Sequence, residues 1–291
     1  QINIYIMKQV STEPIRVAIQ GGYGAFHEIA ALHYFGSDKV EIVPGQTFTQ
    51  LLKNLANQDA DYGIMAIENM VAGSIIPNYK LLKDSNMKIT GEIYLRIKQN
   101  LVALPGQTID DIKEVYSHAM ALLQCQDFFE QYPHIRYIES PDTALSAKHI
   151  RDEQLSGVGA ISSEQAAVRY DLEIIKAGIE SNKKNYTRFL ILKDRNGDEE
   201  QPHEVNKSSL TFALAHKIGS LSKVLSIFSF HHINLSKIQS LPIIGKDWEY
   251  QFYVDVEFDD YEIYNQAVSA IKPFTSGLEI LGEYKRGKSI M

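Results

Sequence analysis

The sequence predicts an α/β domain with a largely parallel sheet, followed by a smaller α+β module. Three observations support this prediction. Short apolar segments typical of strands alternate with amphipathic helical segments from about residue 15 to residue 195. A polar, charged stretch without periodicity follows at 196–207 and is the best candidate for a linker. Beyond it the order of segments changes to strand, helix, strand, strand, helix, strand.

Composition and charge limit the possible partners. A chain of 291 residues, 44% hydrophobic and 22% charged, is an ordinary globular protein of two or three domains. The net charge of -7 argues against a nucleic-acid surface, so an anionic ligand must be met by local donors. The single cysteine, Cys125, excludes an intrachain disulfide and favours a cytoplasmic protein. No apolar run approaches the roughly 18 residues of a membrane span, so we expect no membrane partner.

The first half of the chain predicts alternating strands and helices. Residues 1–14 are expected to be an extension before the first strand at 17–19, which leads through GGYG into a helix at 26–35 that Gly36 ends. A strand at 41–45 precedes a helix capped by Thr47. The segment DYGIMAIENMVAGSI then predicts a strand, a polar loop and the start of a helix.

The middle of the chain repeats this pattern. EIYLRIKQNLVAL predicts one or two strands, and VYSHAMALLQCQDFFEQY predicts a strand, a turn at Ser117-His118 and a helix. TALSAKHIRDEQ, GVGAIS and SEQAAVRYD predict a helix, a strand and a helix. NYTRFLIL, which begins at Asn185, has a polar start and an apolar end typical of a buried strand.

The C-terminal segment has a different organisation. SLTFALA predicts a strand, GSLSKVLSIFSFHHI a helix, and INLSKIQSLPI a second strand. In WEYQFYVDVEF every second residue from Trp248 to Phe258 is apolar, which predicts a half-buried strand. A helix at 261–271 and a strand at LEILGEY complete the order βαββαβ, which is the ferredoxin-like arrangement.

Four predicted strand ends carry groups suited to a small anion. The glycines of GGYGAF precede a helix N-terminus but have neither the dinucleotide nor the P-loop spacing, so an anion site and a plain turn are equally compatible with them. The other three ends carry Asn69, His118 and Arg188. Asn69 is also explained as a loop residue, His118 as a structural histidine and Arg188 as a surface charge. Taken together, they predict a pocket for a dicarboxylate. No metal or cofactor motif is evident.

Several segments resemble one known family in the same order along the chain. NYTRF resembles the Asn-x-Thr-Arg-Phe signature of prephenate dehydratases. GGYGAFHEIAA, IMAIENMVAGSI and SHAMALLQC resemble three further motifs of that family. The C-terminal module is similar to an ACT domain, with HKIGSLSKVLSIF and NLSKIQSLP at its motif positions. The resemblance runs from about Arg16 to Tyr284.

The resemblance implies an activity and a set of site residues. The family converts prephenate to phenylpyruvate with loss of carbon dioxide and water, and it needs no cofactor. Thr187 is the implied catalytic residue, acting on the leaving hydroxyl as a hydrogen-bond donor or a proton relay. Arg188 is expected to anchor a carboxylate or to hold Thr187 in place. The remaining implied substrate-binding residues are Phe189, Asn185, Glu68, Asn69, Gly73, Ser74, Ala25, Phe26 and His118.

One of these residues is chemically awkward. Glu68 as a free carboxylate would repel a dianion, so we expect it to accept a hydrogen bond or to be protonated. The chain also departs from the family pattern at Ala25 and Met70, where hydroxyl-bearing residues are usual, and at Ala119. These replacements leave the roles of the first two loops and their effect on activity open.

The resemblance also implies a regulated oligomer. We expect the ACT module to bind L-phenylalanine as an allosteric effector, at His216, Gly219, Ser220, Leu221, Asn234, Leu235, Gln239 and Ser240. Gln239 and Leu241 replace a glutamate and an arginine of the family motif, which leaves the strength of inhibition open. Its exposed sheet edge favours a homodimer or a dimer of dimers.

The implied fold is a two-lobed catalytic domain like that of periplasmic binding proteins, with the cleft between the lobes. The expected catalytic domain is 15–195, with lobe 1 at about 15–93 plus 180–195 and lobe 2 at about 94–179. A linker at 196–207 and an ACT domain at 208–286 follow. Because no helical segment precedes Arg16, we expect no fused chorismate mutase. Arogenate dehydratase and a non-catalytic sensor of aromatic amino acids stay open as alternatives.

Overall fold

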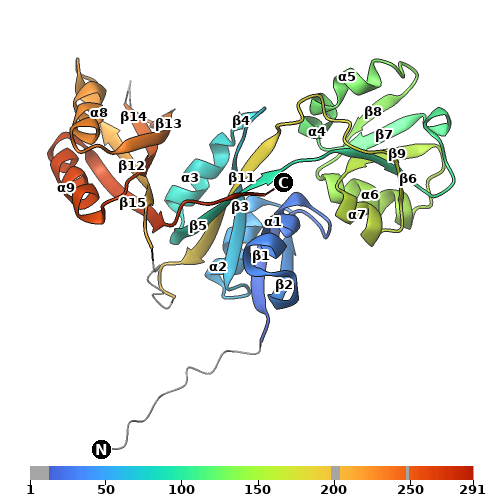
Figure 1. The fold of residues 1–291 in the computed structure, drawn as a ribbon, viewed down its shortest axis with the longest axis horizontal. Helices are drawn as coiled ribbons and strands as arrows, with labels where there is room; N and C mark the ends of the chain where they lie inside the picture. The colour runs from blue at the N-terminus through green and yellow to red at the C-terminus, as the bar shows by residue number, and fades with distance from the viewer. Residues whose placement is uncertain (1–12, 198–203, 247–248, 291) are drawn as a thin grey trace, which may run out of the picture.

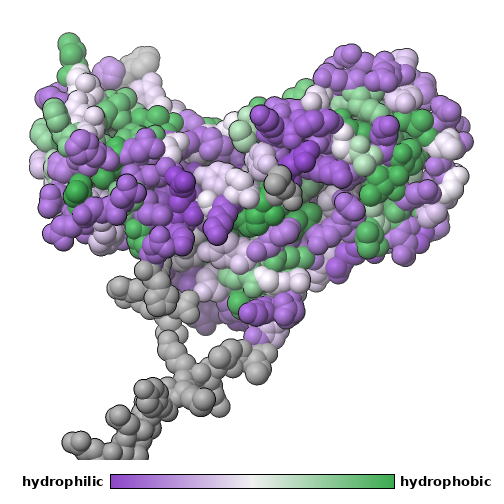
Figure 2. All heavy atoms as spheres, in the orientation of Figure 1, coloured by the Kyte–Doolittle hydropathy of each residue, from purple (hydrophilic) through white to green (hydrophobic). Residues whose placement is uncertain are grey.

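The structure is a computed structural model that describes residues 13–197, 204–246 and 249–290. Most of the expected N-terminal extension, part of the expected linker and Trp248 lie outside these residues. Figure 1 shows three parts in a row, with lobe 1 in the centre, lobe 2 on one side and the C-terminal module on the other. The molecular surface dips between the module and lobe 2 (Figure 2).

Lobe 1 is a mixed sheet covered by helices. Its elements are β1 (Ile15–Gln20), α1 (Phe26–Phe35), β2 (Val40–Gly45), α2 (Phe48–Ala56), β3 (Tyr62–Asn69), β4 (Gly73–Ser74), α3 (Ile76–Asp84), β5 (Met87–Arg96) and the returning β11 (Tyr186–Asp194). A short 3-10 turn, η1 (Ser37–Lys39), joins α1 to β2. The strand order is β5-β11-β3-β1-β2, with β1 parallel to β2 and β3, and β11 antiparallel to both of its neighbours.

Lobe 2 has a separate five-stranded sheet. Its elements are β6 (Asn100–Ala103), η2 (Ile109–Asp111), β7 (Glu114–Ser117), α4 (Ala119–Gln124), α5 (Gln126–Phe129), β8 (Arg136–Glu139), α6 (Thr143–Asp152), β9 (Val158–Ser162), α7 (Glu164–Arg169) and β10 (Glu173–Lys176). The strand order is β10-β6-β9-β7-β8. Strands β5 and β11 lead toward it from lobe 1 (Figure 1). The predicted two-lobed α/β architecture is thereby confirmed, with sheets that are mixed and not largely parallel.

The C-terminal module has the predicted ferredoxin-like order. It consists of β12 (Lys207–Leu214), α8 (Ser220–Phe230), β13 (Asn234–Pro242), β14 (Tyr250–Glu257), α9 (Tyr261–Ile271), η3 (Lys272–Phe274) and β15 (Ser276–Tyr284). The strand order is β13-β14-β12-β15, antiparallel throughout. A final short strand, β16 (Ser289–Ile290), returns to pair with β5.

The module is joined to lobe 1 by backbone pairing. Strand β15 pairs with β5 at Gly282 and Ile89, so that one path of hydrogen-bonded strands runs through both. A Cβ atom at Gly282 would collide with the Ile89 carbonyl oxygen, which explains the need for glycine at this position. The pairing fixes the module against the strand next to β11.

A hydrophobic core also spans this junction. Tyr253, Leu281 and Tyr284 of the module belong to one buried cluster with Ile89 and Leu190 of lobe 1. The prediction that β14 is a half-buried strand is therefore wrong, because its second face packs on lobe 1 while its first face packs under the module's helices. Alternation along the strand could not reveal this second cover, because Gln251 and Asp255 are polar residues on that face.

Candidate functional site

Thr187 and Arg188 leave opposite faces of β11. Thr187 lies opposite Leu95 on β5 and Asn69 on β3, so the three side chains share one face of the sheet. Phe189 shares this face and packs edge-on against His27 of α1, with 4.9 Å between the ring centroids. The Thr187 face is thus the face that α1 covers, and Arg188 points the other way.

A β-bulge in β3 decides which of two neighbouring residues lies opposite Thr187. Arg188 pairs with Glu68, but Phe189 pairs with Ala66, so Ile67 is the extra residue. Beyond the bulge Asn69 shares the face of Thr187, whereas Glu68 shares the face of Arg188. The bulge therefore determines that Asn69, and not Glu68, lies opposite Thr187, while strand alternation turns the two side chains to opposite faces.

The orientation of the Asn69 amide is fixed by its backbone neighbours. Its Oδ1 accepts hydrogen bonds of 3.0 and 2.9 Å from the amides of Val71 and Ala72. Since backbone N–H groups only donate, Nδ2 must be the donor on the other side. It donates to Thr187 Oγ1 at 2.9 Å and to Asn185 Oδ1 at 2.7 Å. The Thr187 oxygen is an acceptor in this bond, so its own proton is available for another partner.

Gln124 of α4 connects this cluster to lobe 2. Its Oε1 accepts a 2.9 Å hydrogen bond from Asn185 Nδ2, and its Nε2 donates to Asn69 Oδ1 at 3.4 Å. Thr187, Asn69 and Asn185 are each less than a tenth exposed. The structure therefore brings together the expected residues Thr187, Asn69 and Asn185 at the boundary between the two lobes.

The glycine turn after β1 is a contact surface between the lobes. A Cβ atom at Gly24, where φ is +88°, would lie 2.7 Å from Ala166 Cα, and one at Gly22 would lie 2.7 Å from Leu145 Cδ2. Ser163 Oγ donates a 2.6 Å hydrogen bond to the Gly24 carbonyl. Ala25 is buried in the same contact. Close approach of α6 and α7 thus explains the glycines better than an anion site at this turn.

A pocket of about 370 Å³ lies between α1, the β5–β6 connection and α7. This volume is within the roughly 300–1,000 Å³ typical of small-molecule sites. Its apolar wall includes Phe26 and Leu95, and its polar groups include Arg96, Lys98 and Asn100. Because Leu95 lies directly opposite Thr187 on the same face, the pocket lies beside the Thr187 cluster. Of the expected site residues, Phe26 lines it.

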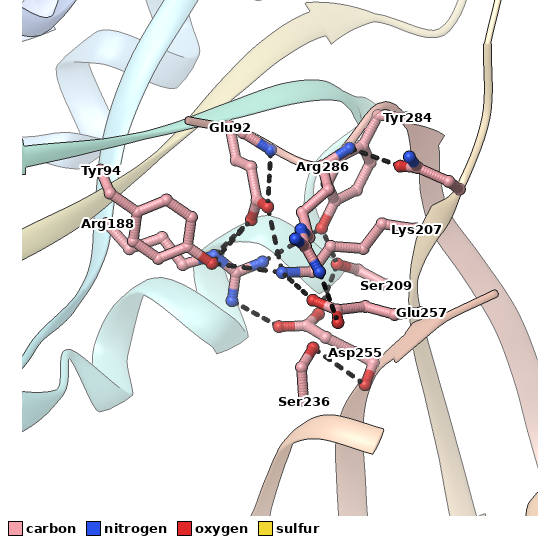
Figure 3. A network of polar contacts seen from close by, with 12 residues as sticks. Glu92, Tyr94, Arg188, Lys207, Ser209, Ser236, Asp255, Glu257, Tyr284 and Arg286 are labelled. Carbon is pink, nitrogen blue, oxygen red and sulfur yellow. Dashed lines mark hydrogen bonds and ion pairs between the residues drawn. The ribbon is translucent and has the colours of Figure 1, made fainter. Parts of the chain in front are cut away.

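Arg188 is not placed to anchor a substrate carboxylate in this pocket. Its guanidinium, 4% exposed, lies at the junction with the C-terminal module (Figure 3). Nε donates to Glu92 at 2.7 Å, Nη1 to Asp255, and Nη2 to the Tyr284 hydroxyl at 3.1 Å. The expectation of a substrate anchor fails because consecutive residues of a strand face opposite sides.

Glu68 also faces the module. Its carboxylate forms an ion pair with Lys237 of β13, which also donates a 2.7 Å hydrogen bond to Ser74 Oγ. The repulsion expected between Glu68 and a dianion is thus avoided by the direction of Glu68 and by its ion pair with Lys237. Gly73 is exposed in the short strand β4, which pairs with the end of β3.

Two other expected residues have structural roles. His118 caps α4, where Nδ1 accepts a 3.3 Å hydrogen bond from the Met120 amide, and its side chain is exposed. Phe189 is 1% exposed and packs in the core of lobe 1. The structure does not bring either one into the Thr187 cluster.

The expected effector residues lie at two places on the module. Gly219, with φ of +79°, precedes α8, which begins with Ser220 and Leu221; His216 lies in the exposed loop before it. Asn234, Leu235, Gln239 and Ser240 lie on β13. This strand has no partner on its outer edge among the described residues.

Burial and ion pairing set the charge of three groups near the site. Burial lowers the pKa of His27 to about 3, so its imidazole is neutral. Burial alone would raise the pKa of Asp255, but Arg188 and Ser209 hold it below its usual value. The pKa of Arg188 is raised because Asp255 and Glu92 outweigh its burial. The junction therefore keeps its charges paired.

Two kinds of site are not found in the part of the chain that the structure describes. There, no group of three or more histidine, cysteine, aspartate or glutamate side chains could hold a metal ion. No described helix is long and apolar enough to cross a membrane.

Sequence reasoning missed several residues around the site. Gln124 and Lys237 lie inside segments that resemble family motifs, but the motifs alone do not predict what these two side chains contact. Asp255 is a charge in the middle of an apolar strand, which is a signal of a buried ion pair. Arg96, Lys98 and Asn100 had no motif, and only the fold brings them to the pocket.

Comparison with known proteins gives one consistent family. The model of the family described as prephenate dehydratase matches residues 17–197. The bifunctional chorismate mutase/prephenate dehydratase of Aquifex aeolicus (strain VF5) is 33% identical over 274 residues, covering 94% of this chain and 74% of that protein. The chloroplastic arogenate dehydratase/prephenate dehydratase 2 of Arabidopsis thaliana is 35% identical over 280 residues, covering 93% and 72%.

Two solved structures with a similar fold carry different names. The prephenate dehydratase of Arthrobacter aurescens, in complex with L-Phe, has a TM-score of 0.83 and 24% identity, covering 94% of this chain and 90% of that one. GqqA, described as a novel type of quorum quenching acylase, has a TM-score of 0.83 and 26% identity, covering 93% and 98%. The similarity in both cases includes the C-terminal module.

Proposed function

The chain belongs to the prephenate dehydratase family and is an enzyme with that family's activity, and from this premise we propose which groups perform the reaction and its regulation. The proposed catalytic residue is Thr187, in the cleft between the lobes. The observation that carries the proposal is the Asn69–Thr187 hydrogen bond, because it fixes the hydroxyl and leaves its proton free.

The chemistry demands little of the protein beyond orientation. Prephenate loses its ring carboxylate as carbon dioxide while the 4-hydroxyl leaves, and the electron pair of the broken C–C bond completes the aromatic ring. One proton is needed to release the hydroxide as water. The protein therefore has to hold the substrate, remove water from the departing carboxylate and supply a hydrogen bond to the leaving oxygen.

Thr187 fits the last of these tasks. Its Oγ1 accepts from Asn69, so its O–H can donate to the leaving hydroxyl. A threonine is a weak acid, and its role is to donate a hydrogen bond or to relay a proton from solvent. Asn185 and Gln124 hold Asn69 in this orientation from the far side.

The pocket beside Thr187 supplies the remaining contacts. The substrate ring would pack against Phe26 and Leu95, which line its apolar wall. Arg96 and Lys98 would bind the carboxylates in place of Arg188. Arg96 Nη2 lies 3.9 Å from the buried Glu180 carboxylate, but Arg96 Nε is buried and has no hydrogen-bond partner among the described residues, which supports a role in binding an anion.

The same two cations favour prephenate over arogenate. Prephenate carries two carboxylates and a keto group. Arogenate carries the same two carboxylates but has an ammonium group in place of the keto group. Arg96 and Lys98 attract prephenate more strongly, against two nearby carboxylates, Glu164 in the pocket wall and Glu180 at 3.9 Å from Arg96. The similarity to an enzyme named for both activities makes arogenate the second candidate substrate.

The C-terminal module is proposed to be an ACT domain that binds L-phenylalanine. Its ferredoxin-like order, and the L-Phe complex of a structurally similar prephenate dehydratase, support this assignment. The effector would bind near the start of α8 and β13, at the residues expected from the sequence. The open edge of β13 supports pairing with a second chain, as a dimer or a dimer of dimers.

The domain limits are proposed close to those expected from the sequence, with 15–195 as the catalytic domain. Strand β5 extends lobe 1 from about residue 93 to Arg96, so lobe 1 is 15–96 plus 180–195 and lobe 2 is 97–179. Strand β12 begins at Lys207, so the linker is 196–206 and the ACT domain 207–286.

A direct assay tests the function. The protein is mixed with prephenate at neutral pH, and phenylpyruvate is measured by its absorbance in alkali. Arogenate is tested in parallel by the formation of phenylalanine. We expect kcat/KM to be higher for prephenate than for arogenate. No product above the uncatalysed background with either substrate would overturn the proposal. If L-phenylalanine changes neither activity nor sedimentation, the regulatory assignment fails.

A further inference from the structure

A closed network of charges joins the C-terminal module to the strand that carries Thr187. Arg188 of β11 pairs with Glu92 of β5 and with Asp255 of β14. Lys207 of β12 approaches Glu92 at 3.0 Å. Figure 3 shows these side chains converging from lobe 1 and from the module. None of the four is more than about a tenth exposed, so each carboxylate and each cation depends on its partners.

Uncharged partners complete this network. Ser209 Oγ donates to Asp255 and contacts the Tyr284 hydroxyl at 2.7 Å, and Tyr284 also accepts from Arg188. The Lys207 ammonium donates to the Tyr94 hydroxyl at 3.2 Å. The guanidinium is therefore held on all sides, and it cannot turn toward the cleft without losing several of these bonds.

A second contact links the module to the neighbouring strand. Lys237 of β13 pairs with Glu68 and donates to Ser74, and its side chain is 15% exposed. Glu68 directly precedes Asn69, the residue that orients Thr187. Leu241 lies on the same side of β13 and packs into the cluster that spans lobe 1 and the module.

We propose that Arg188 and Glu68 are positioning residues, through which the C-terminal module holds Thr187 and Asn69 from behind. This inference rests on the proposed role of Thr187. Each positioning residue is adjacent in sequence to a cleft residue and points to the opposite face of the sheet. The module is thus a structural part of the catalytic centre. Strand β13 carries the expected effector residues Gln239 and Ser240 as well as Lys237. A shift of β13 would therefore move Lys237 and change its ion pair with Glu68.

Two variants and a matched control test this proposal in the full chain. Lys237→Met removes the ammonium but keeps most of the stem, and Asp255→Asn removes one charge from the buried network. Lys285→Met is the control, because Lys285 pairs with Glu204 in an exposed ion pair, with both side chains more than half exposed. We expect kcat for prephenate to fall about tenfold or more in the first two variants, with KM changed less than threefold.

Further measurements separate positioning from a general loss of stability. Lys237→Arg can still pair with Glu68, so it is expected to restore kcat. Hydrogen exchange of the backbone at 67–72 and 185–189 is expected to be faster in Lys237→Met and Asp255→Asn than in Lys285→Met. If Asp255→Asn does not fold, Lys237→Met alone decides, since it lies at the edge of the junction.

The outcomes are distinct from those of the functional assay. Folded Lys237→Met and Asp255→Asn proteins with the parent kcat and parent exchange rates would overturn the positioning role. A parent protein that does not turn over prephenate would overturn the proposed function instead. The exchange rates then still test the coupling, because unchanged rates at 67–72 and 185–189 contradict it without any substrate.

Discussion

Asn69 Nδ2 donates a 2.9 Å hydrogen bond to Thr187 Oγ1, across the end of two antiparallel strands. The Asn69 carbonyl oxygen is occupied by the amides of Val71 and Ala72, so the amide cannot be reversed without losing both bonds. The hydroxyl proton of Thr187 is consequently directed away from Asn69. This one relationship defines which way the reactive hydrogen points.

Asn69→Asp is expected to lower kcat by about 100-fold or more, comparable to the loss of a positioned proton donor. An ionised aspartate only accepts hydrogen bonds, so the Thr187 hydroxyl would donate to it and would no longer be available to the substrate. The other carboxylate oxygen would still accept from the amides of Val71 and Ala72. Steady-state kinetics with prephenate measure the effect. The control is Asn57→Asp on the exposed end of α2, which should leave kcat unchanged. A fully active Asn69→Asp protein would remove Asn69 from the mechanism.

Gly24→Ala should separate the two lobes on one side of the cleft. The new Cβ would lie 2.7 Å from the backbone of Ala166, and the φ of +88° is unfavourable for alanine. Gly106→Ala has a similar φ of +83° but open space around the Cβ, so it isolates the backbone effect. We expect Gly106→Ala to cost about 1 kcal/mol of stability with activity retained, and Gly24→Ala to lose most of its activity. Equal activity of the two variants would show that lobe contact at Gly24 is not required.

The stability of the fold should depend on pH through His27. In the unfolded chain this histidine binds a proton below its usual pKa of about 6.5, whereas in the folded protein its pKa is about 3. Stability therefore rises with pH between these values and is lost as the pH falls through them, by roughly 1.4 kcal/mol per pH unit. Urea unfolding at pH 6.5, 5.5 and 4.5 measures this slope.

The His27→Gln variant provides the control for that slope. Glutamine does not titrate, and its side-chain oxygen can accept the hydrogen bond that the Ala66 amide donates to His27. Its free energy of unfolding should vary less between pH 6.5 and 4.5 than that of the parent. Parallel slopes in the two proteins would assign the pH dependence to other groups.

Ile238→Lys should prevent association through the open edge of β13. Ile238 is 45% exposed on this strand, and a charge at a free sheet edge disfavours pairing with another chain. Sedimentation velocity is expected to show a dimer or tetramer for the parent and a smaller species for the variant. A monomeric parent, or a variant that sediments like an oligomeric parent, would exclude this edge as the interface.

Local sequence pattern was sufficient for the elements and for part of the site. Alternation of strands and helices predicted both lobes, and motif order led to Thr187, Asn69 and Asn185, which do meet. The direction of Arg188 was not predicted, because the pattern of β11 does not say which face borders the cleft. Only packing of the C-terminal module on the other face decides this.

The same limit applies at β3. The bulge at Ile67 places Asn69, and not Glu68, opposite Thr187, and the sequence there contains no glycine or proline that would mark a bulge. Arg96, Lys98 and Asn100 were likewise beyond prediction, since they reach the pocket through the crossing from β5 to β6 and not through a motif. Long-range packing thus determines most of what local pattern left open.

The central claim is that the Thr187 hydroxyl donates to the leaving oxygen, and comparison of Thr187→Ala with Thr187→Ser tests it most directly. The measurement is kcat for phenylpyruvate formation from prephenate, with the Tm of each protein checked. The account predicts a loss of about 100-fold or more in Thr187→Ala, with KM little changed, and recovery of most activity in Thr187→Ser. A folded Thr187→Ala protein with the parent kcat would contradict it.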